Sequence, residues 1–130
     1  VYLRMSAPRL GRTMTRRCNA ILFDLDDTLI PTTKVDVTAV MTASTAAAAH
    51  LSNAGRAPQI ADNFRGYLAA TPFPPEDSST PVADWRCGLW AKAMGLAEDE
   101  REKARAVYDA WMDARLADFK FAPEVVALIR

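Results

Sequence analysis

Three aspartates lie within four positions of each other, in the stretch Asp24-Leu25-Asp26-Asp27-Thr28-Leu29. Along extended backbone, alternate side chains point the same way, so the carboxylates of Asp24 and Asp26 would lie side by side. Neighbouring carboxylates repel each other, and a divalent cation is the usual compensation. Hard oxygen ligands on a short turn suit Mg²⁺, which keeps several waters and takes one or two protein carboxylates. The stretch therefore predicts a Mg²⁺ site. The alternative is that the aspartates cap a turn or the start of a helix.

The residues just before this cluster predict a β-strand. Residues 20–23 form an apolar run without a polar break, the pattern of a buried parallel strand. The acidic cluster would then lie at the carboxyl end of that strand, where open α/β sheets bind their ligands. We therefore expect an α/β fold with the acidic turn at the edge of its sheet.

Residues 21–29 resemble the first signature motif of the haloacid dehalogenase superfamily of phosphohydrolases, an apolar strand followed by D-x-D-x-T-L. The resemblance implies that Asp24 is the nucleophile and Asp26 the general acid and base. It also implies that the Asp24 side chain and the Asp26 backbone carbonyl bind Mg²⁺. A second acid favours a phosphatase over the dehalogenase branch, which lacks it. The chemistry agrees, because a carboxylate attacking phosphorus splits hydrolysis into two easier steps, each of which needs a proton transfer.

Amphipathic helices are expected to follow the acidic turn. The alanines at 43 and 46–49 favour a helix that Gly55 closes, and Pro58 suits the first turn of the next one. Residues 70–81 carry four prolines and predict a loop, residues 97–119 contain neither Gly nor Pro, and Pro123 begins a last helix. The apolar residues expected on the buried faces are Val37, Val40, Met41, Ala48, Leu51, Ile60, Phe64, Leu68, Trp85, Leu89, Trp90, Met94, Ala104, Val107, Tyr108, Trp111, Leu116 and Phe119.

This spacing resembles the subgroup of the superfamily in which a helical cap is inserted soon after the first strand. The stretches Asp84-Trp85-Arg86 and Tyr108…Trp111…Arg115 are similar to phosphatases that act on a phosphorylated sialic acid, although Pro31 and Asp27 depart from their pattern. Arg86 and Arg115 are candidates to bind a substrate carboxylate, for which a guanidinium is well shaped. The alternative is that these arginines are solvated or form salt bridges, and that the aromatic residues simply make the core of the cap.

The expected fold is a haloacid-dehalogenase-like Rossmannoid α/β core with an inserted α-helical cap. We expect a flexible leader over residues 1–17, the first core strand and catalytic turn over 18–32, the cap over 33–119, and the start of a return to the core over 120–130. The leader is rich in Arg and free of acids, as transit peptides are, but translated upstream sequence or a tail explains it equally. The later Ser or Thr, Lys and acidic pair that the resemblance implies would lie beyond Arg130, so these 130 residues alone are expected to be inactive.

Composition narrows the classes of partner. Acidic and basic residues balance at 16 each, so there is no net charge to attract nucleic acid or an anionic membrane. No apolar stretch approaches the roughly 20 residues of a membrane span. Cys18 and Cys87 are far apart without metal-like spacing, which fits a reduced, cytoplasmic protein, and His50 is not expected to be a ligand. The expected partner is a small phosphorylated substrate.

Two further interpretations of function stay open at this point. Another capped phosphatase, acting on phosphoglycolate or a sugar phosphate, would carry the same acidic turn, because the cap sets the choice of substrate. A non-catalytic fragment with an interaction or regulatory role would carry the turn without using it.

Overall fold

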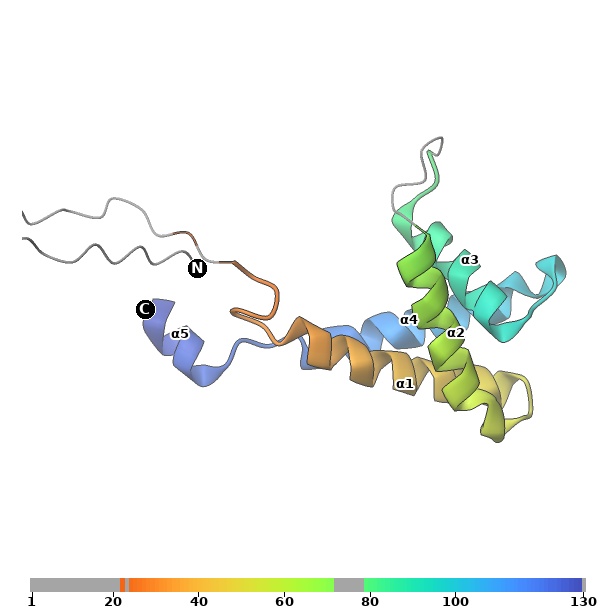
Figure 1. Cartoon of the computed structure of the whole chain (residues 1–130), viewed down its shortest axis with the longest axis horizontal. Coiled ribbons are helices and arrows are strands. Elements are labelled where there is room, and N and C mark those ends of the chain that lie inside the picture. The colour runs from red at the N-terminus through yellow and green to blue at the C-terminus, as the bar shows by residue number, and fades with distance from the viewer. Residues whose placement is uncertain (1–21, 23, 72–78, 130) are drawn as a thin grey trace, which may run out of the picture.

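A computed structural model describes residues 22, 24–71 and 79–129. Within this part of the chain the regular structure is helical: α1 (Thr32–His50), η1 (Ala54–Arg56), α2 (Ala57–Ala70), α3 (Val82–Met94), η2 (Glu98–Glu100), α4 (Arg101–Asp118) and α5 (Pro123–Ile129). Helices α1 and α4 lie side by side and form the most extensive pair, and α2 and α3 pack against them and against each other (Figure 1). Helix α5 lies beyond the bundle, after four residues without regular structure.

Local sequence explains where these helices begin and end. Pro31 precedes the first residue of α1, and Pro58 lies in the first turn of α2, where a missing N–H costs no hydrogen bond. Helix α3 ends at Gly95, whose positive φ of 72° is a conformation that glycine adopts without strain. There the amide of Leu96 donates to the carbonyl of Ala91, which closes the helix end.

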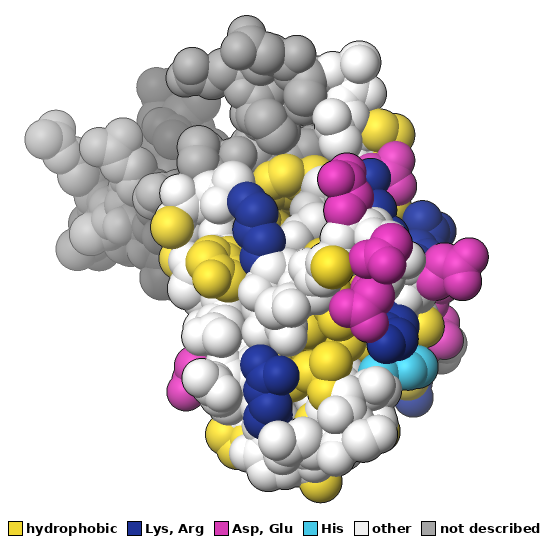
Figure 2. Space-filling model, turned by 90° about the vertical axis from the view of Figure 1, so that its right-hand side faces the viewer, with side chains coloured by type: hydrophobic (Ala, Val, Ile, Leu, Met, Phe, Trp, Pro, Cys, Tyr) yellow, Lys and Arg dark blue, Asp and Glu magenta, His cyan; other side chains and the backbone are white. Residues whose placement is uncertain are grey.

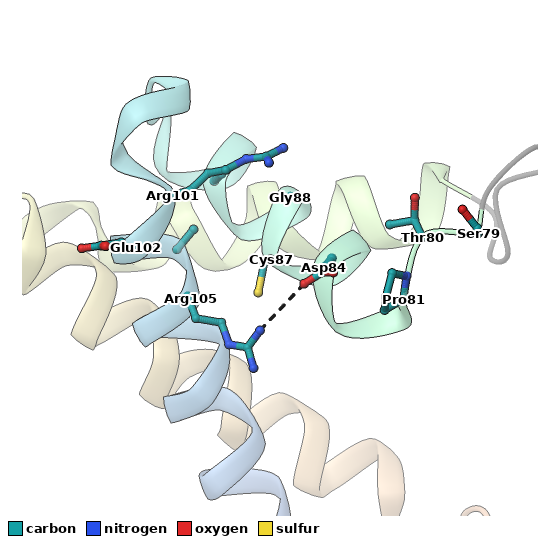
Figure 3. Close-up of a pocket in the computed structure, with 11 residues that line it drawn as sticks. Ser79, Thr80, Pro81, Asp84, Cys87, Gly88, Arg101, Glu102 and Arg105 are labelled. Atoms are coloured by element: carbon teal, nitrogen blue, oxygen red, sulfur yellow. Dashed lines mark ion pairs between the residues drawn. The ribbon is translucent and has the colours of Figure 1, made fainter.

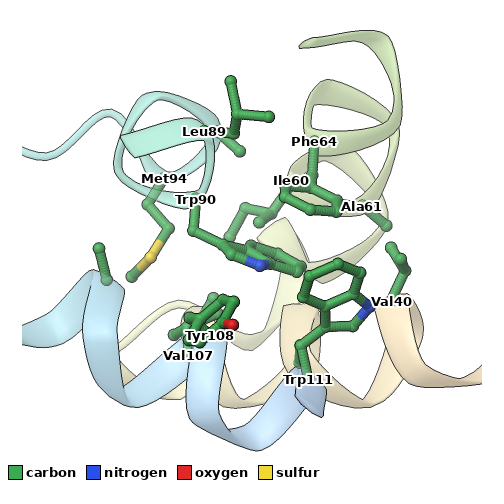
Figure 4. Packing of buried hydrophobic residues seen from close by; sticks show 14 of the residues in the cluster. Val40, Ile60, Ala61, Phe64, Leu89, Trp90, Met94, Val107, Tyr108 and Trp111 are labelled. Atoms are coloured by element: carbon green, nitrogen blue, oxygen red, sulfur yellow. The ribbon is translucent and has the colours of Figure 1, made fainter. Parts of the chain in front are cut away.

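An aromatic cluster fills the centre of the bundle. The rings of Phe64 on α2 and Trp90 on α3 stack with centroids 3.8 Å apart, and Trp111 on α4 meets both edge-on (Figure 4). The face that α1 turns to this cluster is lined by small side chains, above all Ala43 and Ala47, which are fully buried. Small residues let α4 approach α1 closely while the large rings occupy the space between the other helices.

The expected α/β fold is wrong for the part of the chain that the structure describes. No strand is present there, and Leu22, the one described residue of the predicted strand, is 90% exposed. Residues 20, 21 and 23 lie outside the described residues. The single β-bridge joins Asp26 and Ile30 within one turn. A parallel strand depends on hydrogen bonds to neighbouring strands, and the described residues offer it no partner. The architecture is a helical bundle, not a Rossmannoid core with a cap.

The expected helices are present, but two boundaries and one buried face differ. Helix α1 ends at His50 and leaves Gly55 in η1, and η2 precedes α4 at Glu98–Glu100. Val37 and Met41 of α1 are 51% and 38% exposed, because α1 turns its alanine-rich side inward. Leu116 is likewise 64% exposed near the end of α4.

Among the described residues no helix has the length and apolar character needed to cross a membrane.

Loss of one ring from the central cluster should destabilise the whole bundle. Phe64→Ala removes a fully buried side chain and leaves a cavity beside Trp90 and Trp111, so we expect it to lower the free energy of unfolding by about 3–5 kcal/mol. Urea denaturation followed by circular dichroism measures this. Tyr67→Ala, at a half-exposed aromatic on the same helix, should cost about 1 kcal/mol or less. Equal losses would show that the cluster does not hold the bundle together.

Candidate functional site

The acidic cluster forms a tight turn in front of α1. The carbonyl of Leu25 accepts hydrogen bonds from the amides of Leu29 and Ile30, both at 3.1 Å. Ile30 is 4% exposed, while the three aspartates and Thr28 are exposed. The turn therefore presents its carboxylates to solvent at the end of the bundle from which α1 starts.

The carboxylate of Asp27 has a structural role. Its Oδ1 accepts the backbone N–H of Thr33 at 2.8 Å, and its Oδ2 accepts the hydroxyl of the same residue. These bonds satisfy an amide in the first turn of α1, whose preceding residue, Pro31, makes no side-chain cap. The two hydrogen bonds from Thr33 also hold the pKa of Asp27 below its ordinary value. Asp27 has a positive φ of 51°, which Asp tolerates better than most residues.

Asp24 and Asp26 are not used in this way. The Oδ1 of Asp24 accepts the N–H of Leu25 at 3.0 Å, and its Oδ2 makes only a long contact of 3.5 Å with the Thr28 hydroxyl. The carboxylate of Asp26 makes no hydrogen bond or ion pair with any other residue that the structure describes. The structure thus places both predicted site residues on one exposed turn rather than on a strand, and it leaves their carboxylates available to a ligand.

The donors of this turn suit Mg²⁺ better than a transition metal. They are carboxylate and carbonyl oxygens, and no group of three or more His, Cys, Asp or Glu that could hold a metal occurs within the described ranges. Magnesium commonly binds through one or two carboxylates and completes its shell with water and substrate oxygens. Asp24 and Asp26 would supply that number of carboxylates.

The two predicted substrate arginines converge on one ring. The guanidinium carbons of Arg86 on α3 and Arg115 on α4 lie 5.3 Å and 5.1 Å from the centroid of Trp111. Both distances are those of a cation–π interaction. The structure therefore brings together two residues that are far apart in the sequence, and it adds an aromatic platform that holds them.

Arg115 and Arg86 nevertheless differ in their partners. The Nε of Arg115 lies 2.5 Å from Oδ1 of Asp36, and the Arg115 side chain is only 22% exposed. Asp36 belongs to the same first turns of α1 that Asp27 caps, so Arg115 ties α4 to the helix end that carries the acidic turn. Arg86 has a buried Nε without a hydrogen bond and has no carboxylate partner in the described part of the chain. Arg86 is the arginine still able to pair with a ligand.

Sequence reasoning missed Asp36 as the partner of Arg115, whereas the alternative that an aspartate caps a helix start is confirmed for Asp27. An Asp–Arg pair between two helices separated by most of the chain leaves no local signal. The D-x₅-T spacing from Asp27 to Thr33 is a possible signal, because an Asx side chain often satisfies an amide at a nearby helix start.

Comparison with models of protein families and with curated proteins found no match for this chain.

Asp27→Asn should destabilise the start of α1, and the loss should depend on pH. The pKa of Asp27 is lower in the folded state than in the unfolded chain, where it is about 3.9. Its contribution to the free energy of unfolding is therefore complete above about pH 3.9 and is lost as the pH falls through the lower pKa of the folded state. At pH 7 we expect the melting temperature to fall by a few degrees, and the difference from wild type to vanish in acid. Thermal melts by circular dichroism across pH measure this.

Asp24→Asn is the matched control for this experiment, because the Asp24 carboxylate makes no bond to α1. It should leave the melting temperature unchanged. A fall as large as that of Asp27→Asn, or one independent of pH, would contradict the capping role.

Proposed function

We propose that this chain contributes to Mg²⁺-dependent hydrolysis of a phosphomonoester, with Asp24 and Asp26 as its reacting carboxylates. The observation that carries the proposal is the division of roles within the acidic turn. Asp27 is bound to α1, whereas Asp24 and Asp26 are exposed on the same turn with carboxylates that make no bond to the helices. The proposal depends on this turn and on its resemblance to the D-x-D-x-T-L motif, and it needs no parallel sheet.

The two carboxylates would divide the reaction between them. An Asp24 oxygen attacks phosphorus, the ester P–O bond breaks, and Asp26 gives its proton to the leaving alkoxide. Water then attacks the aspartyl-phosphate, Asp26 takes the proton of that water, and the Asp24 carboxylate and inorganic phosphate are released. The hydrogen bond from the Leu25 amide would hold Asp24 in one orientation for attack. Bound Mg²⁺, held by the Asp24 side chain and the Asp26 carbonyl, supplies positive charge against the phosphoryl oxygens.

The substrate we propose is N-acylneuraminate 9-phosphate, a sialic acid phosphate. The proposal rests on the similarity of the stretches around Arg86, Trp111 and Arg115 to N-acylneuraminate-9-phosphatase. It is supported by Arg86, whose guanidinium is held over Trp111 and lacks a carboxylate partner among the described residues. The sugar acid carries such a carboxylate, and an Arg pairs with it through parallel hydrogen bonds. Phosphoglycolate and sugar phosphates are the alternative substrates.

Replacing Asp24 tests the reaction itself. In the protein that carries this sequence, Asp24→Asn should lower phosphate release from N-acylneuraminate 9-phosphate by several decades, because the amide cannot form the aspartyl-phosphate. A colorimetric phosphate assay with Mg²⁺ present measures this. Asp27→Asn is the matched control, since it changes the neighbouring carboxylate of the same turn, and it should keep turnover within about tenfold of wild type at a temperature where it is folded. Near-normal turnover by Asp24→Asn, or equal losses in both variants, would refute the proposal.

Replacing the arginines tests the substrate. Arg86→Ala should weaken turnover of N-acylneuraminate 9-phosphate by about tenfold or more and spare p-nitrophenyl phosphate, which has no carboxylate. Arg115→Ala breaks the ion pair with Asp36 and should affect both substrates alike through the fold. Measuring kcat/KM for both substrates in each variant separates these effects. A parallel loss on both substrates in Arg86→Ala would exclude carboxylate recognition by this residue.

A further inference from the structure

A cavity of about 670 Å³ lies between α3 and α4 (Figure 3), and no residue of the acidic turn lines it. Its volume is within the range of small-molecule sites in proteins. Small residues make one part of its wall: Cys87, Gly88 and Ala91 on α3 and Ala104 on α4. Burial raises the pKa of the Cys87 thiol, which is therefore neutral at pH 7. This part of the wall is uncharged and without large side chains, so a flat apolar molecule can lie against it. The other lining residues are Ser79, Thr80, Pro81, Asp84, Arg101, Glu102 and Arg105.

Charged residues lie around this wall. Arg105 is held in place by Asp109, with 3.2 Å between Nε and Oδ1, and by Asp84, with 3.8 Å between Nη1 and Oδ1. Arg101 also lines the cavity and forms no ion pair with any described residue. Figure 3 shows the Arg101 side chain extending over the Gly88 side of the cavity, while the Glu102 carboxylate points the other way. Arg101 is therefore a positive group at the cavity that is not paired with a carboxylate of the described residues, although Asp84 and Glu102 also line the cavity.

The surroundings limit the charge of a ligand. Glu98, Asp99 and Glu100 of η2 immediately precede Arg101, and acidic side chains gather on one side of this end of the molecule (Figure 2). These carboxylates would repel a dianion more than a monoanion. We therefore propose that the cavity between α3 and α4 binds a small monoanionic molecule with a flat apolar body. Its carboxylate or sulfonate pairs with Arg101, and its body lies against the wall around Gly88. This site is separate from the phosphatase proposal and does not depend on it.

Anilinonaphthalene sulfonate, a fluorescent monoanion with an aromatic body, is the probe for this site. We expect one dye to bind per chain, and N-phenylnaphthylamine, which lacks the sulfonate, to bind at least about tenfold more weakly. Benzoate should displace the dye at lower concentration than phenyl phosphate, which has the same ring and a second negative charge. Fluorescence titration measures each of these affinities.

Gly88→Leu tests the location. A Cβ at Gly88 meets no atom within 4 Å, so a side chain can start there, and the leucine would occupy part of the cavity and should weaken dye binding by at least about tenfold. Gly66→Leu is the matched control, because Gly66 is a helical glycine with the same free space, on α2 and outside the cavity. Leucine favours a helix more than glycine does, so both variants should remain folded.

Arg101→Gln tests the role of the positive charge and should weaken binding of the dye by about tenfold. Lys92→Gln, at an exposed residue of α3 outside the cavity, should leave binding of the dye unchanged.

Several results would overturn the proposal. They are absence of dye binding to wild type, equal binding by Gly88→Leu and Gly66→Leu, equal affinity for the two dyes, and an unchanged affinity in Arg101→Gln. Failure of both benzoate and phenyl phosphate to displace the dye, or stronger displacement by phenyl phosphate, would overturn it as well.

Discussion

The stack of Phe64 on Trp90, closed from the side by Trp111, is the contact on which the rest of the bundle depends. Each ring comes from a different helix, so none of the three helices can bury its largest side chain unless the other two are in place. Helix α1 contributes almost no bulk to this centre and completes it with alanines. On one side of the bundle, aromatic rings of α2, α3 and α4 contact each other. On the other side, the alanines of α1 let its backbone come close to α4. Both kinds of packing are needed to exclude water from the rings.

Trp111 also connects the core to the end of the molecule that carries the acidic turn. Its ring supports Arg115, Arg115 pairs with Asp36, and Asp36 lies in the first turns of α1. Asp27 fixes the acidic turn on α1, because its amide donates a hydrogen bond to the Thr32 hydroxyl at 3.2 Å. Ile30, at the end of the turn, is buried. Contacts thus extend from the aromatic centre through Arg115 and Asp36 to the first turns of α1, and through Asp27 to the acidic turn.

Sequence alone predicted the helices well, because the signals that define them are local. Proline at positions 58 and 123 acts within a turn of where it stands, whereas Gly55, the residue predicted to close the first helix, lies in η1 after α1 has ended. On α1 the prediction was confirmed for Val40 and Ala48, which are buried, and wrong for Val37 and Met41, which are exposed because close packing against α4 favours alanine. The predicted strand was also wrong in the described residues. A strand is decided by neighbouring strands, and a run of four apolar residues contains no information about whether such neighbours exist. For the candidate site, the sequence identified the acidic turn and the two arginines, but the Asp36–Arg115 pair depends on tertiary structure.

The acidic turn shows why a motif of identical residue types need not have identical roles. Spacing on a strand would have paired Asp24 with Asp26 because their side chains share a face. In the structure Asp24 and Asp26 differ from Asp27 for another reason. Asp27 has a positive φ, and its carboxylate reaches the Thr33 amide at the start of α1. That helix amide is available only to the residue at this position of the turn. While Asp27 satisfies the helix, Asp24 accepts only the amide of Leu25 and a long contact from the Thr28 hydroxyl. Two exposed carboxylates close in sequence repel each other, and a cation or a proton relieves that repulsion. The capping of α1 by Asp27 thus leaves the carboxylates of Asp24 and Asp26 exposed on the same turn without a bond to the helix.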